Sequence, residues 1–325
     1  MRAAFADAVR LSVAFLLMVV LLGGAGEARA APDRCNLGAY ITSLSQVDTA
    51  AGTFRADFWM WSVCPSSELE PLKTLEFVNA VSVQPSLDST LKRDGGWWAT
   101  RKFTGIFRQD FSLHNYPFDE QPLVIDIEEG VLDTRDFVYA ADNVNSGMNP
   151  AVDLAGWRLK DFQLTGGVTT HPTTFGDPSL RGGVSRYATL KMQVGVERNH
   201  MANFVKATFP LYISALLALI SLTVTDGRMS LLGATTFAVV LSFVSVEKLV
   251  GPHDGVYLLD QLHFATLALI MAVTGQGVIS LRAIAHGGDA AVQRRRDLHG
   301  AAILLGGYVV LNLILIGRAI IDAKT

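Results

Sequence analysis

Residues 111–128 read FSLHNYPFDEQPLVIDIE, and this stretch decides how the rest of the chain is interpreted. Apolar and polar residues alternate on both sides of a Tyr-Pro-Phe-Asp turn, which is the pattern of two β-strands joined by a short loop. Pro117 favours a turn here because its ring restricts the backbone angle φ. Further along the chain, four long apolar segments begin. The combination indicates a β-domain followed by a membrane domain.

Residues 1–30 have the pattern of a secretory signal peptide. Arg2 and Arg10 precede an apolar run over residues 11–22, and residues 28–30 (ARA) form a small-x-small cleavage site. We expect cleavage there, which places the mature N-terminus outside the cytoplasm. An uncleaved anchor helix is the alternative, although an apolar run of about 12 residues is short for a membrane span.

The chain has 2 cysteines, Cys35 and Cys64. An exported chain can form a disulfide, and residues 47–52 (VDTAAG) read as a hairpin turn midway between the two cysteines. The cysteines would therefore face each other across the hairpin. We predict a Cys35–Cys64 bond, with two free buried thiols as the alternative.

Residues 31–200 have the composition and spacing of an all-β domain. Gly-rich turn signals separate short runs of alternating character, which predicts an antiparallel, immunoglobulin-like β-sandwich. The expected strands span residues 40–47, 53–63, 102–113, 123–127, 157–164 and 187–196.

After Arg198 the pattern changes to long apolar segments, each sufficient to cross a bilayer as a helix. The four expected helices span about residues 204–225, 228–248, 256–282 and 299–321. The loop before the last helix contains three consecutive arginines, residues 294–296. Positive charge favours the cytoplasmic side, so we expect the N-terminal domain and the C-terminus to lie outside the cytoplasm.

The second apolar segment is unusual because hydroxyl and acidic residues recur on one helical face. Alternating steps of four and three residues select one stripe of a helix. The stripe has an acid at each end, a serine near the first acid and apolar residues in the middle: Asp226, Ser230, Ala234, Phe237, Leu241, Val244 and Glu247.

These features together resemble the prokaryotic pentameric ligand-gated ion channels, in the superfamily that contains the Cys-loop receptors. The turn and the residues after it match the Tyr-Pro-Phe-Asp-x-Gln motif of that family, and Arg198 precedes Pro210 at the family spacing. The cysteines that flank this turn in other members would fall at Gln109 and Leu123, so the chain resembles the prokaryotic members, which lack that disulfide. The resemblance covers nearly the whole mature chain.

The resemblance implies a homopentamer in the bacterial inner membrane. Residues 31–203 would form the periplasmic ligand-binding sandwich, and residues 204–325 the multi-pass transmembrane domain. Five copies of the stripe would line the pore, with Phe237 and Leu241 forming an apolar gate. The acidic rings at Asp226 and Glu247 predict selectivity for monovalent cations. Arg228, beside Asp226, matches a basic position that the family directs away from the lumen.

The resemblance also implies which residues couple the sandwich to the pore. Asp119 and Arg198 would form a buried ion pair that joins the two domains. The turn would contact the membrane helices, and Pro252 would lie where the turn presses on the loop after the pore helix. The expected coupling residues are Tyr116, Pro117, Phe118, Asp119, Arg198 and Pro252.

The predicted ligand site is less complete. In the family, agonists bind between adjacent sandwiches among aromatic side chains, but one of these positions falls at Gly130 here. We expect a small amine or a proton as the ligand. The candidate binding residues are Trp59, Phe77, Glu129, Phe175 and Tyr187. Packing of Trp59 and Phe77 in the core is the alternative.

Other classes of function find little support in the sequence. A net charge of -3 without a basic, aromatic-interleaved tract argues against nucleic-acid binding. No H-E-x-x-H, G-x-S-x-G or C-x-x-C motif occurs, so we expect neither an enzyme nor a cofactor. The expected partners are the lipid bilayer, other copies of the chain, permeating cations and a small extracellular ligand. Two alternatives remain: an anion-selective channel, and a non-conducting periplasmic receptor with a membrane anchor.

Overall fold

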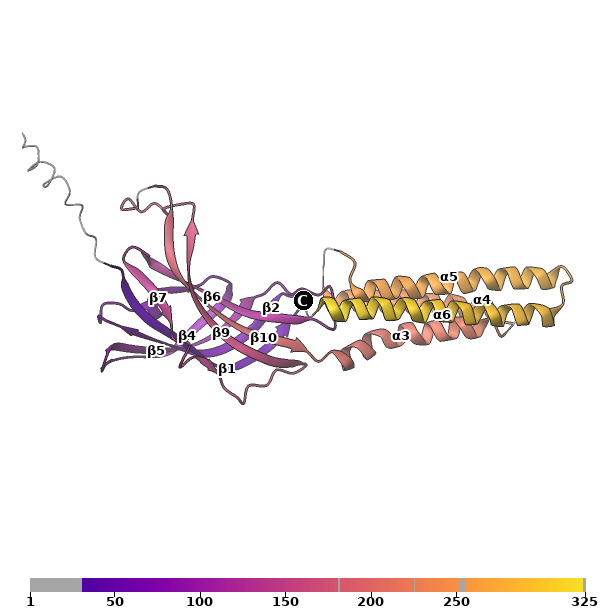
Figure 1. Ribbon diagram of the computed structural model, residues 1–325, viewed down its shortest axis with the longest axis horizontal. Coiled ribbons are helices and arrows are strands. Elements are labelled where there is room, and N and C mark those ends of the chain that lie inside the picture. Colours follow the sequence, from indigo (N-terminus) through magenta and orange to yellow (C-terminus); the bar gives the residue numbers. More distant parts are fainter. Residues whose placement is uncertain (1–30, 181, 225, 252–254, 324–325) are drawn as a thin grey trace, which may run out of the picture.

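A computed structural model describes residues 31–323 apart from 181, 225 and 252–254. The expected signal peptide and Pro252 lie outside the described residues. The molecule is elongated, with β-sheets at one end and four helices at the other (Figure 1).

Two sheets form the N-terminal domain. The larger sheet has the order β4-β5-β2-β1-β7, with β8 also paired to β1, and the smaller has the order β3-β6-β10-β9. The larger sheet contains β1 (Asp33–Asp48), β2 (Thr53–Cys64), β4 (Ala80–Arg93), β5 (Gly96–Arg108), β7 (Phe137–Ala141) and β8 (Gly147–Met148). The smaller sheet contains β3 (Leu75–Phe77), β6 (Glu120–Asp133), β9 (Trp157–His171) and β10 (Ser185–Arg198), and the short helix α2 (Pro71–Thr74) precedes β3.

The core lies between the sheets and follows the alternation along each strand. On β2, Phe54, Ala56, Phe58 and Met60 are buried, while Arg55, Asp57 and Trp59 between them are partly exposed. Ile125 and Ile127 of β6 belong to the same cluster, which packs the two sheets together. This confirms the predicted β-sandwich. One detail differs, because β1 pairs in parallel with β7 and β8.

The loop before the Tyr-Pro-Phe-Asp turn differs from the expected strand. β5 ends at Arg108 and β6 begins at Glu120, so Phe111–Leu113 is not a strand. The Gln121 side chain binds both the backbone N–H and the C=O of Ser112, at 3.2 and 2.7 Å, in place of a neighbouring strand. Leu113 leaves the sandwich core and packs with the helices.

The two cysteines form the predicted disulfide. β1 and β2 pair in an antiparallel register that sets Asn36 opposite Val63, which places the two cysteines at the next position. Cys35 is fully buried and Cys64 is nearly so, and both belong to the sandwich core. The bond therefore closes the first hairpin from inside.

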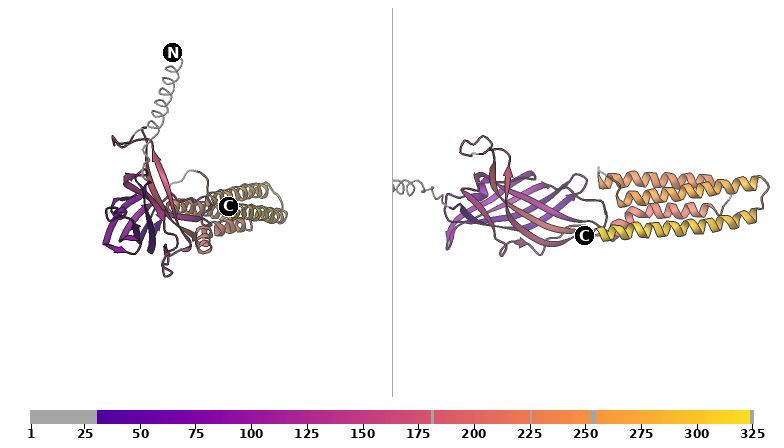
Figure 2. Two further views of the ribbon diagram at one scale, coloured as in Figure 1. Left: turned by 60° about the vertical axis from the view of Figure 1, so that its left-hand side comes forward. Right: turned by 45° about the horizontal axis from the view of Figure 1, so that its top comes forward.

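Within the described residues, four helices are long and apolar enough to cross a membrane. They are α3 (His200–Ser221), α4 (Arg228–Val250), α5 (Leu258–Ala285) and α6 (Ala290–Asp322), and they run side by side in Figure 1 and in the right-hand view of Figure 2. The last helix begins at Ala290 rather than near residue 299, because the Asp289 carboxylate accepts hydrogen bonds from the first backbone N–H groups. α4 packs against α3 and α5, and the C-terminal end of α6 returns to the sandwich (Figure 1).

Candidate functional site

The junction between the sandwich and the helices is built around Asp119 and Arg198. Arg198 donates from Nε to Oδ1 of Asp119 at 2.8 Å and from Nη2 to Oδ2 at 3.1 Å. Gln121 donates a further bond to Oδ2 at 2.9 Å. The carboxylate is 4% exposed, so the pair is shielded from water and the geometry is bidentate. The end of β10 is thereby tied to the turn that opens β6.

Two aromatic rings enclose the same guanidinium group. The Arg198 Cζ atom lies 4.1 Å from the centre of the Trp157 ring and 4.7 Å from that of Tyr116. Burial raises the pKa of the Tyr116 hydroxyl, while the charge of Arg198 opposes this and that of Asp119 adds to it. Trp157 was not among the site residues predicted from the sequence. It begins β9, and the pairing of β9 with β10 places it opposite Arg198.

The turn contacts two of the helices directly. The ring centres of Phe118 and Phe204, on α3, are 5.4 Å apart. The backbone N–H of Leu258, at the start of α5, donates to the carbonyl of His114 at 3.1 Å. Tyr116 is buried in the cluster that contains the helix side chains. Turn, α3 and α5 therefore form one packed unit.

A second contact joins the sandwich to the end of α4. Gly251 ends this helix with φ 87°, and a Cβ placed there would lie 2.9 Å from the Cα of Ala50. Ala50 belongs to the β1–β2 turn. Only glycine fits both the backbone angle and this close approach. The β1–β2 loop therefore touches the residue that ends α4.

The predicted stripe of α4 is the exposed face of that helix. Asp226 lies just before the helix begins, and the other six residues lie on it. All seven are exposed in the single chain: Asp226, Ser230, Ala234, Phe237, Leu241, Val244 and Glu247. Phe237 is 70% exposed. The opposite face is buried against α3 and α5, with Leu232, Val239 and Val246 in the helix cluster. Arg228 is on the buried side, at 3% exposure.

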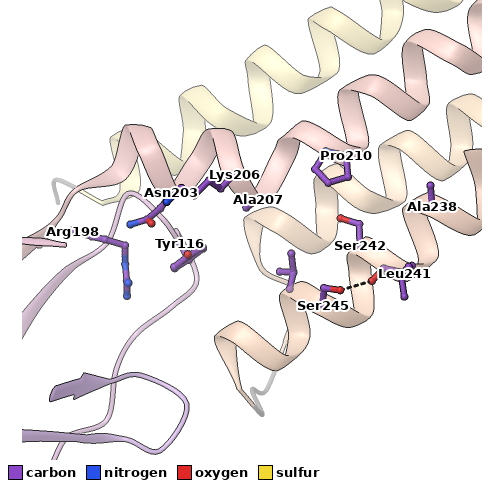
Figure 3. A pocket seen from close by; sticks show the side chains of 11 residues that line it. Tyr116, Arg198, Asn203, Lys206, Ala207, Pro210, Ala238, Leu241, Ser242 and Ser245 are labelled. Carbon is purple, nitrogen blue, oxygen red and sulfur yellow. Dashed lines mark hydrogen bonds between the residues drawn. The ribbon is translucent and has the colours of Figure 1, made fainter. Parts of the chain in front are cut away.

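A cavity of about 670 Å³ opens between the Tyr-Pro-Phe-Asp turn and α4 (Figure 3). Tyr116 and Arg198 line it on the side of the sandwich, and Leu241 and Ser245 line it from α4. Pro210 contributes from α3. The cavity therefore lies between the residues expected to couple the domains and those expected to form the gate.

Two of the predicted ligand residues do not share a site within one chain. Phe77 packs against the rings of Phe58 and Phe103, with centres 5.7 and 5.0 Å apart, inside the sandwich. Trp59 alternates with the buried Phe58 and Met60, so its side chain faces the other side of the sheet. The placement of Phe77 favours the alternative of a core residue.

Glu129 also does not reach the surface. It is 1% exposed, and its carboxylate accepts hydrogen bonds from the Tyr139 and Thr74 hydroxyls at 2.8 and 2.9 Å. Burial raises the pKa of the Tyr139 hydroxyl, and the neighbouring Glu129 raises it further. Backbone N–H groups of Val131 and Leu132 complete the shell. Glu129 is thus part of the sandwich interior.

Phe175 and Tyr187 do come together, around a histidine that the sequence analysis missed. His171 lies at the end of β9, and its ring centre is 5.4 Å from that of Phe175 and 6.0 Å from that of Tyr187. Its Nε2 atom is 2.7 Å from Oε1 of Glu128. The hairpin that carries the group projects from the sandwich in Figure 1. The β9–β10 register, which pairs Ser185 with His171, and the β6–β10 register, which pairs Thr189 with Glu128, bring these segments together.

The fold and the junction define a membrane protein with a β-sandwich head on four apolar helices. No known family model matches the chain. The chain is 26% identical over 151 residues to a protein of Gloeobacter violaceus described as a proton-gated ion channel. This match covers 40% of the chain and 42% of the relative. Sequence and fold together confirm the resemblance to prokaryotic pentameric ligand-gated ion channels. The description of the relative as an ion channel agrees with the class of protein expected for this chain.

Proposed function

We propose that this chain is the subunit of a homopentameric, cation-selective channel of the bacterial inner membrane, opened by protons that act on its periplasmic sandwich. The observation that carries the proposal is the stripe of α4, whose seven residues are all exposed in the single chain and which has a carboxylate at each end. Carboxylates and hydroxyls are unfavourable against lipid chains and favourable around water. A central pore supplies that water and leaves Asp226 and Glu247 to concentrate cations.

Assembly of several copies is supported by the cavity as well as by the stripe. Asn203, Lys206 and Ser245 line an opening between α3 and α4, two helices apolar enough to cross a membrane. Polar side chains facing hydrocarbon are unfavourable, and a neighbouring copy would cover them. Pentamer number rests on the family resemblance.

Protons are proposed as the ligand because of the pair formed by His171 and Glu128. A histidine side chain ordinarily gains a proton between about pH 5 and pH 8, and its positive charge would then strengthen the contact with the carboxylate. The described relative is proton-gated, which is consistent with this reading. A small amine is the second candidate, because the aromatic rings of Phe175 and Tyr187 lie beside the His171 ring that contacts Glu128.

The test is a current recorded from purified protein in liposomes under a NaCl gradient. External pH is lowered first, and primary amines are then added at neutral pH. A current that reverses near the sodium potential supports the proposal. Reversal near the chloride potential would establish the anion-selective alternative, and silence with verified insertion would favour the non-conducting receptor.

Variants connect the current to the two sites. Asp226→Asn should lower the cation-to-chloride permeability ratio, whereas Asp289→Asn, which keeps a capping side chain at the start of α6, should leave it unchanged. His171→Gln should move the pH of half-activation while leaving the reversal potential unchanged. Activation that is identical in wild type and His171→Gln would reject His171 as the sensor.

A further inference from the structure

The inner end of α4 carries a positive charge, Arg228, that is turned away from the pore stripe. Its Nε donates to the carbonyls of Ser221 and Val224 at 3.1 and 2.8 Å, and its Nη2 donates to the carbonyl of Leu222 at 3.1 Å. The guanidinium therefore closes the C-terminal end of α3, where carbonyl groups have no helical partner. These carbonyls orient the charge, but they carry no full negative charge to balance it.

The balancing charge comes from Asp297 on α6. Its Oδ2 atom lies 3.3 Å from Nη2 of Arg228, with side-chain exposures of 2% and 3%. Ser280 of α5 donates to the same Oδ2 at 2.6 Å, and Gln276 donates to the Asp297 backbone carbonyl at 3.2 Å. A buried charge requires a partner with further hydrogen bonds, and this carboxylate has both.

Two glycines allow the helices to approach closely enough for this network. A Cβ on Gly277 would lie 3.1 Å from Cδ of Arg228, and one on Gly300 would lie 2.2 Å from Nε2 of Gln276. The packing at this end of the bundle is therefore shaped around the ion pair.

We infer that Asp297 determines the charge selectivity of the inner pore mouth, although it lies on the last helix and is not on the pore stripe. The inference rests on the proposed channel function. Asp226 is exposed at the start of the stripe, two positions before Arg228 in the chain. The charges of Asp226, Arg228 and Asp297 sum to one net negative charge per chain at this level. Without the Asp297 carboxylate, the positive charge of Arg228 cancels the negative charge of Asp226.

The nearby arginine run does not change this comparison. Arg294, Arg295 and Arg296 are exposed, so mobile ions screen their charges. They are also the same in every variant compared below. The buried pair is screened much less, so loss of the Asp297 charge acts on the mouth at short range.

The test compares reversal potentials of wild type and Asp297→Asn in the same NaCl gradient. We expect the cation-to-chloride permeability ratio of the variant to fall roughly threefold or more. Asp289→Asn removes a negative charge from the same helix at an exposed cap, and Ser280→Ala removes a hydrogen bond to Asp297 without changing charge. Both controls should keep the wild-type ratio. Arg228→Gln with Asp297→Asn removes both charges and should return the ratio close to that of wild type.

The outcomes separate the inference from the proposed function. A wild-type protein that carries no selective current overturns both. A cation-selective wild type whose ratio is unchanged in Asp297→Asn overturns the inference alone. If Asp297→Asn does not reach the membrane, Arg228→Gln and the double variant are compared from about pH 8 to about pH 10, because a buried carboxyl without a charge partner ionises only at raised pH. A higher ratio in Arg228→Gln supports the inference, and equal ratios overturn it.

Discussion

Arg198 and Asp119 form a bidentate, buried ion pair at the point where the last strand of the sandwich approaches the first membrane helix. Arg198 ends β10, and α3 begins at His200. Asp119 belongs to the turn whose Phe118 ring contacts Phe204 of α3. The pair therefore fixes the strand, the turn and the helix relative to one another.

Breaking this pair from either side should strongly destabilise the protein. Asp119→Asn leaves a buried guanidinium without its charge partner, and Arg198→Gln leaves a buried carboxylate. Each change should lower the free energy of unfolding by about 3–5 kcal/mol. Thermal unfolding of the purified protein and the amount that reaches the membrane provide the measurements.

The control for this prediction is an ion pair on the surface of the same sheet. Lys191 and Asp126 lie 3.5 Å apart with half-exposed side chains. Lys191→Gln should change the free energy of unfolding by less than about 1 kcal/mol. If the double variant at positions 119 and 198 lost the sum of the two single losses, the residues would be acting independently.

Much of the architecture follows from local patterns in the chain. The strands with strict alternation, such as β2 and β10, and the four apolar helices could be predicted because burial on one face leaves a period in the sequence. The Cys35–Cys64 bond could be predicted because hairpin register follows from the turn. Predicting this bond therefore required no information about contacts between distant segments.

The features that were missed depend on contacts between distant segments. β4 is mostly exposed and contains Pro85, which suits the edge of a sheet but hides the strand in the sequence. Asp297 follows three arginines, and this local sequence is typical of a helix end exposed to solvent. Only the packing of α6 against α5 shows that it faces Arg228.

Gly251 should be intolerant of a side chain because of its contact with the β1–β2 loop. Gly251→Ala would place a methyl group 2.9 Å from the Cα of Ala50 and strain a backbone with φ 87°. We expect the loop to be displaced from α4, so that activation requires roughly fivefold more agonist or protons. Gly275→Ala is the matched control, since a Cβ there meets nothing within 4 Å. Unchanged activation of Gly251→Ala would remove this contact from the coupling pathway.

The stability of the sandwich should depend on the charge of Asp133 at acid pH. Burial alone would raise the pKa of this carboxyl, but backbone N–H groups of Arg135 and Arg186 and the Arg135 side chain outweigh it and lower the pKa. A pKa that is lower in the folded state contributes stability above the unfolded value of about 3.9, which is lost as pH falls through the folded pKa. Asp133→Asn should therefore lower the free energy of unfolding at neutral pH by about 1–3 kcal/mol.

The pH series supplies the decisive comparison for Asp133. The difference between wild type and Asp133→Asn should shrink as pH falls below about 4, because the wild-type carboxyl then loses its charge. Asp153→Asn, at an exposed position, controls for the loss of one surface charge. A difference that stays constant across this range would show that shape, and not ionisation, is responsible. Thermal unfolding followed by circular dichroism gives both curves.

Phe237 should determine how well the closed pore excludes water and ions. Its ring lies on the exposed stripe of α4, between the two acidic ends, and is 70% exposed in one chain. Phe237→Ala should widen an apolar constriction and remove the surface that favours dewetting, so current at neutral pH should rise on the order of tenfold. Met271→Ala is the control, because Met271 is 74% exposed but lies on α5, away from the stripe. The resting current of Phe237→Ala could stay at the wild-type level while acid still opens the channel. The constriction would then lie at another level of the stripe, and Leu241→Ala should raise the current at neutral pH instead.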